Sequence, residues 1–144
     1  MKKLAFAAVA LAAACGGSST KFPTITITAP GASSSVTLDS TKIVPVQYST
    51  TDFTVKPLGS CGSESTNCGH VHVLIDGALC SGRNPYNNTS TAAPTANADF
   101  SKCDPSVVYG SHTVTLELHT DGHNPIASAN GQQIAAAVPF TVTP

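Results

Sequence analysis

The stretch Cys68-Gly69-His70-Val71-His72-Val73-Leu74-Ile75-Asp76-Gly77 predicts a β-strand that ends in a turn. Its side chains alternate with a period of two, which is typical of a half-buried strand. One face is expected to carry Val71, Val73 and Ile75, and the other His70, His72, Leu74 and Asp76. The Asp-Gly pair supplies turn chemistry. Two imidazoles are therefore expected side by side on one face of the strand.

Similar short runs lie on both sides of this strand, separated by Gly, Pro, Ser and Asn. They predict strands at residues 24–28, 35–38, 43–48, 53–55, 110–118, 134–138 and 140–142. Pro45 indicates a sheet edge or a bulge, because proline has no N–H for a ladder. Residues 78–105 read as a long irregular loop. The pattern predicts an all-β fold, an immunoglobulin-like β-sandwich of about seven strands.

Length and charge narrow the classes of function. The chain has 144 residues, enough for one domain, and a formal net charge of −1 with 10% charged residues. So sparse a charge argues against a nucleic-acid partner. No Gly-x-Ser-x-Gly elbow is present, and the only glutamates, Glu64 and Glu117, are not paired for acid–base chemistry. The sequence therefore predicts a protein that is not an enzyme.

The first residues predict an export signal. Lys2 and Lys3 precede a short apolar run from Leu4 to Ala14, too short to span a bilayer. The end of this run fits cleavage by the general signal peptidase, and it also resembles the lipobox of bacterial lipoproteins, in which the cysteine after the cut is acylated. That resemblance implies lipidation of Cys15.

The number of cysteines favours the lipoprotein. Five cysteines leave one unpaired in an exported chain, whereas lipidation of Cys15 leaves an even set of four. The expected organisation is a signal peptide at 1–14, the lipidated cysteine and a flexible tether at 15–22, and the sandwich at 23–144. The lipid would anchor the protein to a membrane of the bacterial cell envelope. By analogy with enteric sorting this is the outer membrane, with the domain facing the periplasm or the cell surface.

The four remaining cysteines allow three disulfide pairings. Cys61–Cys68 with Cys80–Cys103 is favoured, because each bridge closes a segment that otherwise lacks regular structure. A cysteine metal site is disfavoured, because exported proteins fold in an oxidising compartment and the chain has no C-x-x-C spacing.

The histidines raise a second function. All five lie between positions 70 and 123, and His70 and His72 form an H-x-H pair that can present two nitrogens to copper or zinc. His112 and His123 are the expected further ligands. The alternative is structural, because His112 has the parity of the core residues Val114 and Leu116. By the same parity His119 is expected to face solvent.

Two resemblances support the fold. Ile75-Asp76-Gly77 followed by Gly110-Ser111-His112-Thr113-Val114 resembles bacterial immunoglobulin-like modules. The run 69–76, with His112-Thr113-Val114 and His123-Asn124-Pro125, is similar to small periplasmic domains of unknown function with a Gly-His-His-His-Leu-Leu-Ile-Asp signature. This second resemblance implies that His70, His72, His112 and His123 form one set and that His119 lies outside it.

These observations predict a lipid-anchored, non-catalytic binding or structural module of the cell envelope. Its ligand would be an unidentified protein or glycan bound by the loops, because loops on a rigid scaffold usually carry recognition. The alternative is a periplasmic protein that binds copper or zinc through the histidine set.

Overall fold

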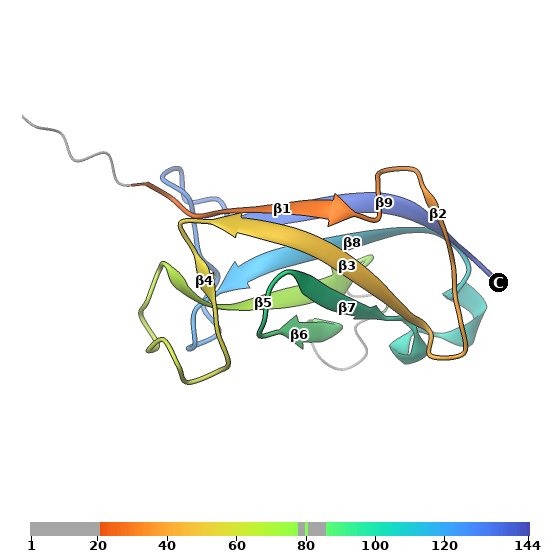
Figure 1. The fold of residues 1–144 in the computed structure, drawn as a ribbon, viewed down its shortest axis with the longest axis horizontal. Coiled ribbons are helices and arrows are strands. Elements are labelled where there is room, and N and C mark those ends of the chain that lie inside the picture. The colour runs from red at the N-terminus through yellow and green to blue at the C-terminus, as the bar shows by residue number, and fades with distance from the viewer. Residues whose placement is uncertain (1–20, 78–79, 81–85) are drawn as a thin grey trace, which may run out of the picture.

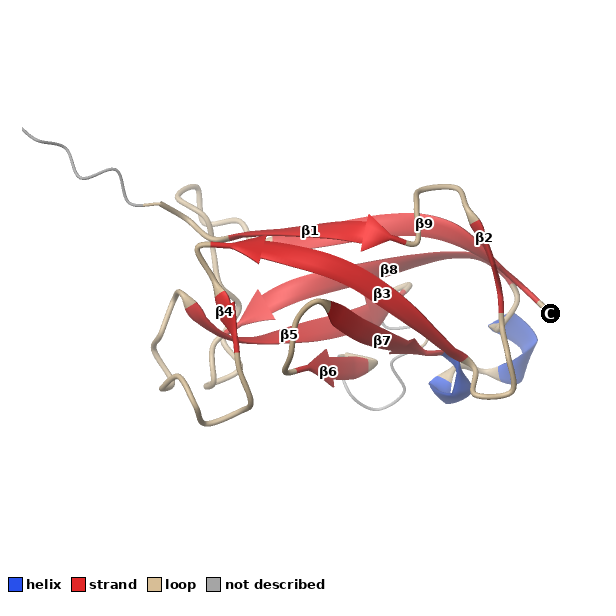
Figure 2. Ribbon diagram, in the orientation of Figure 1, coloured by secondary structure: helices blue, strands red, loops and turns tan. Residues whose placement is uncertain are grey.

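The computed structural model describes residues 21–77, 80 and 86–144. The predicted signal peptide, Cys15 and all but the last two residues of the predicted tether lie outside the described residues. The described chain forms two β-sheets that pack face to face (Figure 1). Figure 2 shows that strands dominate the fold and that the helices are short turns. Within the described residues no helix is long and apolar enough to cross a membrane.

The described residues contain nine strands and two 3-10 helices, which connect as follows. They are β1 (Thr24–Ala29), β2 (Ser35–Thr37), β3 (Ile43–Thr51), β4 (Thr54–Val55), β5 (Cys68–Ile75), β6 (Asn88–Ser90), β7 (Thr95–Asp99), η1 (Phe100–Lys102), η2 (Pro105–Val107), β8 (Gly110–His119) and β9 (Ala135–Thr143).

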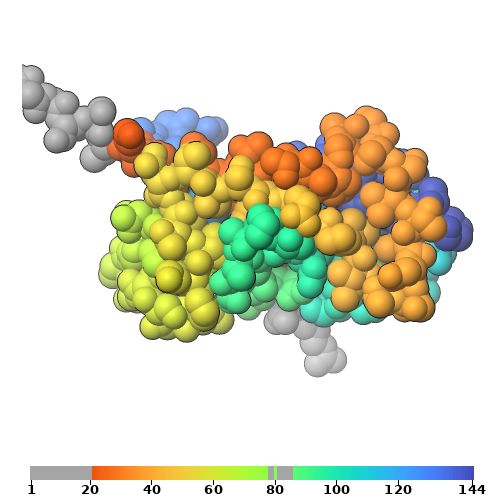
Figure 3. Space-filling model, in the orientation of Figure 1, coloured from red at the N-terminus to blue at the C-terminus, as the bar shows by residue number. Residues whose placement is uncertain are grey.

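One sheet has three antiparallel strands in the order β1-β3-β7. The other has the order β2-β9-β8-β5-β4, with β6 also paired to β5. Its central pairs β5–β8 and β8–β9 are antiparallel, whereas the edge pairs β2–β9 and β4–β5 are parallel. Figure 3 shows the molecule from the side of β1, β3 and β7, and the chain enters the fold at the opposite end from its C-terminus.

The core lies between the sheets, and it forms because each long strand places an apolar residue at every second position. Transfer of these side chains from water is the main driving force for folding. Fully or almost fully buried residues on the inner faces include Val44, Val46, Tyr48, Val71, Val73, Ile75, Val114, Leu116, Leu118, Phe140 and Val142.

The all-β sandwich predicted from the sequence is confirmed, with more strands than the expected seven. The additional strands β6 and β7 lie in residues 78–105, where a loop was predicted. Their sequences, Asn-Thr-Ser and Thr-Ala-Asn-Ala-Asp, have little apolar contrast, because alanine is the only inward-facing residue of β7. Pro45 lies in a central strand but beyond the end of β1, whose pairing with β3 stops at Gln47. The missing N–H therefore costs no ladder bond on that side.

The cysteines meet the prediction in part. Cys61 and Cys68 form a disulfide with a Cα–Cα distance of 5.6 Å. The predicted bridge between Cys80 and Cys103 is not formed, and both residues are buried free thiols in hydrogen-bond contact. Both lie against the core, so β6, β7 and the packing of Phe100 order this region in place of a bridge.

Candidate metal centre

Strands β5 and β8 place a group of polar side chains on the outer face of the larger sheet. Their register sets His70 opposite His119 and His72 opposite Glu117. Because side chains alternate between faces, these four residues share the outer face while Val71 and Leu118 point into the core. His70 is 0% exposed and His72 is 5% exposed. The outer face of the sheet is therefore covered at this point.

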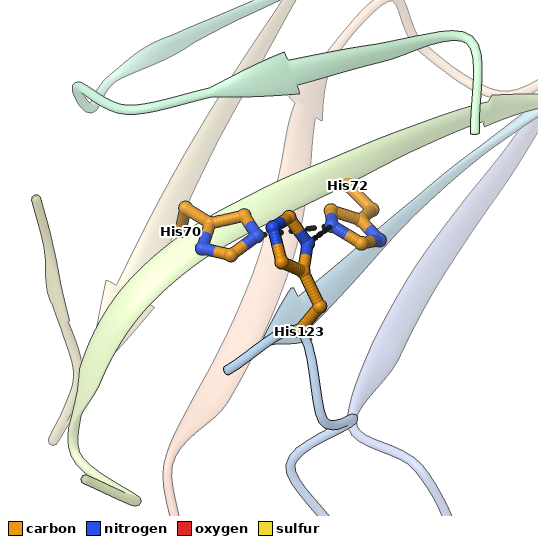
Figure 4. A group of neighbouring side chains, drawn as sticks. All are labelled: His70, His72 and His123. Carbon is orange, nitrogen blue, oxygen red and sulfur yellow. Dashed lines mark hydrogen bonds between the residues drawn. The ribbon is translucent and has the colours of Figure 1, made fainter. Parts of the chain in front are cut away.

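Three imidazoles converge at this covered point (Figure 4). His70 and His72 project from β5, and His123 reaches in from the turn that follows β8. His70 Nε2 lies 2.9 Å from His72 Nε2, and His72 Nε2 lies 3.2 Å from His123 Nδ1. The ligand nitrogens of all three residues lie within 4.8 Å of one another. A tetrahedral ion with metal–nitrogen bonds of about 2.0–2.1 Å separates its ligands by about 3.3 Å.

Protons alone do not satisfy this arrangement. A neutral imidazole nitrogen either carries one hydrogen or offers one lone pair. His72 Nε2 has two nitrogen partners, so it makes at most one full hydrogen bond with them. The other nitrogen of His70, Nδ1, is buried and has no hydrogen-bond partner among the described residues. A metal ion satisfies all three converging lone pairs at once.

The position of His123 depends on a chain of contacts from the disulfide. Asp121 Oδ2 accepts hydrogen bonds from the backbone N–H groups of Cys61 at 2.6 Å and Gly62 at 3.1 Å. Cys61 is bonded in turn to Cys68, two residues before His70. The His123 N–H donates to the Thr120 carbonyl at 2.9 Å, which closes the turn. The disulfide loop therefore fixes the turn that carries the third imidazole.

Two further rings hold His72 in place. His119 stacks on it with ring centroids 3.7 Å apart, and Tyr86 stacks on it at 4.1 Å. The ring nitrogens of His119 are already engaged, Nδ1 with the His123 carbonyl at 3.1 Å and Nε2 with Glu117 at 3.2 Å. His119 therefore packs beside the cluster, and the prediction that it faces solvent is wrong, because the β8–β9 connection folds back over it.

The prediction that His112 joins this set is wrong. His112 lies on the core face of β8, where its ring meets Phe100 edge-on at a centroid distance of 5.0 Å. Its Nδ1 lies 2.6 Å from Asp76 Oδ2. The alternative reading from parity, a core histidine with a hydrogen-bond partner, is the one that the structure shows. The convergence of His70, His72 and His123 is as predicted.

Burial governs the charge of the two strand histidines. Burial, and then repulsion from the neighbouring imidazoles, lowers the pKa of His70 to about 4 and that of His72 to about 3. Both side chains are therefore neutral at pH 7, the state in which an imidazole binds a metal. Three neutral nitrogen donors suit Cu²⁺ and Zn²⁺, and they leave coordination positions free for water or another ligand.

The metal-free protein is expected to lose stability in mild acid. Unfolded histidines have a pKa of about 6.5, whereas His70 and His72 take up protons only near pH 4 and pH 3 in the folded state. Below pH 6.5 the unfolded chain therefore binds more protons, and the free energy of unfolding falls as the pH falls. Chelator-treated protein should melt about 5 °C or more lower at pH 5 than at pH 7.5. A smaller difference is expected in His72→Gln, and equal melting of the wild type at both values would contradict the assignment.

Comparisons with protein-family models, with curated proteins and with solved structures find no match to this chain. The fold and the site define the class to which it belongs. It is an all-β domain with a buried cluster of three histidines on the outer face of one sheet.

Proposed function

We propose that this protein binds a transition-metal ion, Cu²⁺ or Zn²⁺, through His70, His72 and His123, and that it does so as a lipid-anchored, non-catalytic protein of the bacterial cell envelope. The observation that carries the proposal is the meeting of three imidazole nitrogens at a buried point. Side-chain protons cannot satisfy all three of these contacts.

The donor set favours copper over zinc in affinity. Imidazole binds both ions, and Cu²⁺ forms the tighter complex with a given nitrogen site. Two ligands come from a rigid strand of the sheet, so little conformational entropy is lost when the ion binds. The low pKa of His70 and His72 removes competition from protons for these two ligands at neutral pH.

The envelope location rests on the leader and on the four cysteines that remain after Cys15. The closed Cys61–Cys68 bridge agrees with folding in an oxidising compartment. In that setting the module of the sequence-based prediction and the metal-binding protein are one molecule, whose bound ligand is the ion.

A titration tests the proposal. The full-length protein, freed of metal by a chelator, should bind Cu²⁺ with a dissociation constant below about 1 μM in calorimetry. Electron paramagnetic resonance of the complex should show couplings to imidazole nitrogens. At a free ion concentration 100 times the dissociation constant, binding should stabilise the fold by about 2.7 kcal/mol. A copper spectrum without imidazole couplings, or no saturable binding, would overturn the proposal.

A further inference from the structure

A second group of ligand atoms lies away from the three-histidine cluster. It contains Asp76 at the end of β5, the buried thiol of Cys80 and His112 near the start of β8, with ligand atoms within 4.8 Å of one another. Cys103 adds another sulfur, since its thiol is in hydrogen-bond contact with that of Cys80. Cys80 is 0% exposed and Cys103 is 7% exposed.

Asp76 orients the imidazole of this group. Its Oδ2 lies 2.6 Å from His112 Nδ1, and its Oδ1 accepts the Thr113 N–H at 2.7 Å. The carboxylate therefore accepts the proton on Nδ1 and leaves a lone pair on Nε2. His112 Nε2 is buried and has no hydrogen-bond partner among the described residues. A carboxylate that holds one nitrogen of a histidine while the other nitrogen binds metal is the usual outer shell of a zinc ligand.

The two thiols are unusual for an interior pair. Two buried sulfurs in contact satisfy each other with one weak hydrogen bond and leave the second S–H proton unused. Burial raises the pKa of both thiols, so in the absence of an ion they stay protonated and react slowly with oxidants. The ring of Phe100 packs edge-on against His112 and limits access by water.

We propose that Cys80, Cys103 and His112 form a second metal site that takes Zn²⁺, with Asp76 orienting the imidazole. Two sulfur donors and one nitrogen donor, all buried, match the ligands of tetrahedral zinc sites. On binding, each thiol releases one proton and both sulfurs coordinate as thiolates. The ion would join the end of β5, the segment after η1 and the start of β8. The site would be structural, because its donors lie inside the fold.

The test uses Co²⁺ as a spectroscopic substitute for Zn²⁺. Full-length, metal-free protein is prepared under argon without reductant, so that the Cys61–Cys68 bridge stays closed. Its thiols are counted after denaturation, and two are expected. Addition of Co²⁺ should then produce thiolate-to-cobalt charge-transfer absorption in the near ultraviolet, and Zn²⁺ should abolish it. The three-histidine cluster contains no sulfur, so this absorption reports the second site alone.

Matched variants separate the two sites. Cys103→Ser should lose the charge-transfer absorption and bind one ion fewer than the wild type. His123→Asn removes a ligand of the histidine cluster, keeps a residue tolerant of the positive φ of 60° at that position, and should retain the absorption in full. Asp76→Asn should retain the absorption but weaken Zn²⁺ binding about 10–100-fold. Circular dichroism of each variant controls for folding.

Two results would overturn the second site. One is the absence of free thiols, which would show that Cys80 and Cys103 close a disulfide in the purified protein. The other is a protein with two free thiols, folded by circular dichroism, that gives no thiolate charge transfer with Co²⁺. Neither result depends on the histidine cluster, whose copper spectrum is measured separately.

Discussion

Replacement of His72 by alanine should weaken Cu²⁺ binding more than about 100-fold. His72 is the central ligand, because its Nε2 contacts both His70 Nε2 and His123 Nδ1. Without it the two remaining imidazoles approach no common third nitrogen. Calorimetry of wild type and His72→Ala, with nitrogen couplings from electron paramagnetic resonance, measures the effect.

Leu74→Ala is the matched control, because Leu74 lies on the same face of the same strand, two residues further along, and offers no ligand atom. Its affinity for copper should equal that of the wild type. His123→Asn provides a second variant in an exposed turn, where the fold is little affected, and it should also weaken binding. If His72→Ala folds and binds copper as tightly as Leu74→Ala does, the three histidines are not the site.

Gly69→Ala should destabilise the fold by about 3 kcal/mol or more. A β-carbon on Gly69 would overlap the backbone carbonyl oxygen of His119 and would also crowd the His119 carbonyl carbon at 3.1 Å and the Thr120 Cα at 3.2 Å. These are backbone atoms, so no rotamer change relieves the overlap, and β5 and β8 must move apart next to the cluster. Urea unfolding measures the loss.

Gly31→Ala is the control for this substitution. A β-carbon at Gly31 would meet no atom within 4 Å, and the residue is exposed in the turn after β1. Its effect should stay within about 0.5 kcal/mol. A Gly69→Ala protein as stable as Gly31→Ala would mean that β5 and β8 are not as close at this point as the structure places them.

The sequence predicted the parts of the fold that carry strong periodicity. The run 68–77 and the run 110–118 alternate cleanly, and both appear as the central strands of the larger sheet. Strands β6 and β7 were not predicted, because small and polar residues give no contrast between their faces. Cooperative packing against β3 and β5 makes them strands, and packing of this kind is not visible in a local pattern.

The same limit applies to the candidate metal centre. Alternation alone places His70 and His72 on one face, whereas the position of His119 depends on the register between β5 and β8, which single-sequence reasoning does not supply. Parity had assigned His119 to the outer face correctly. Its burial was missed because the connection that covers it has no periodicity.

The three histidines differ in how firmly they are held. His70 and His72 belong to a strand paired on both sides, while His123 is exposed in a turn. An ion at this point would meet solvent on the side of His123, so it would leave when the turn opens and the third bond breaks. The residence time of the ion would then follow the motion of the turn, while the strand pair sets the geometry that selects the metal. Such a division suits a protein that hands its ion to another molecule, because the acceptor needs to displace only the mobile ligand first.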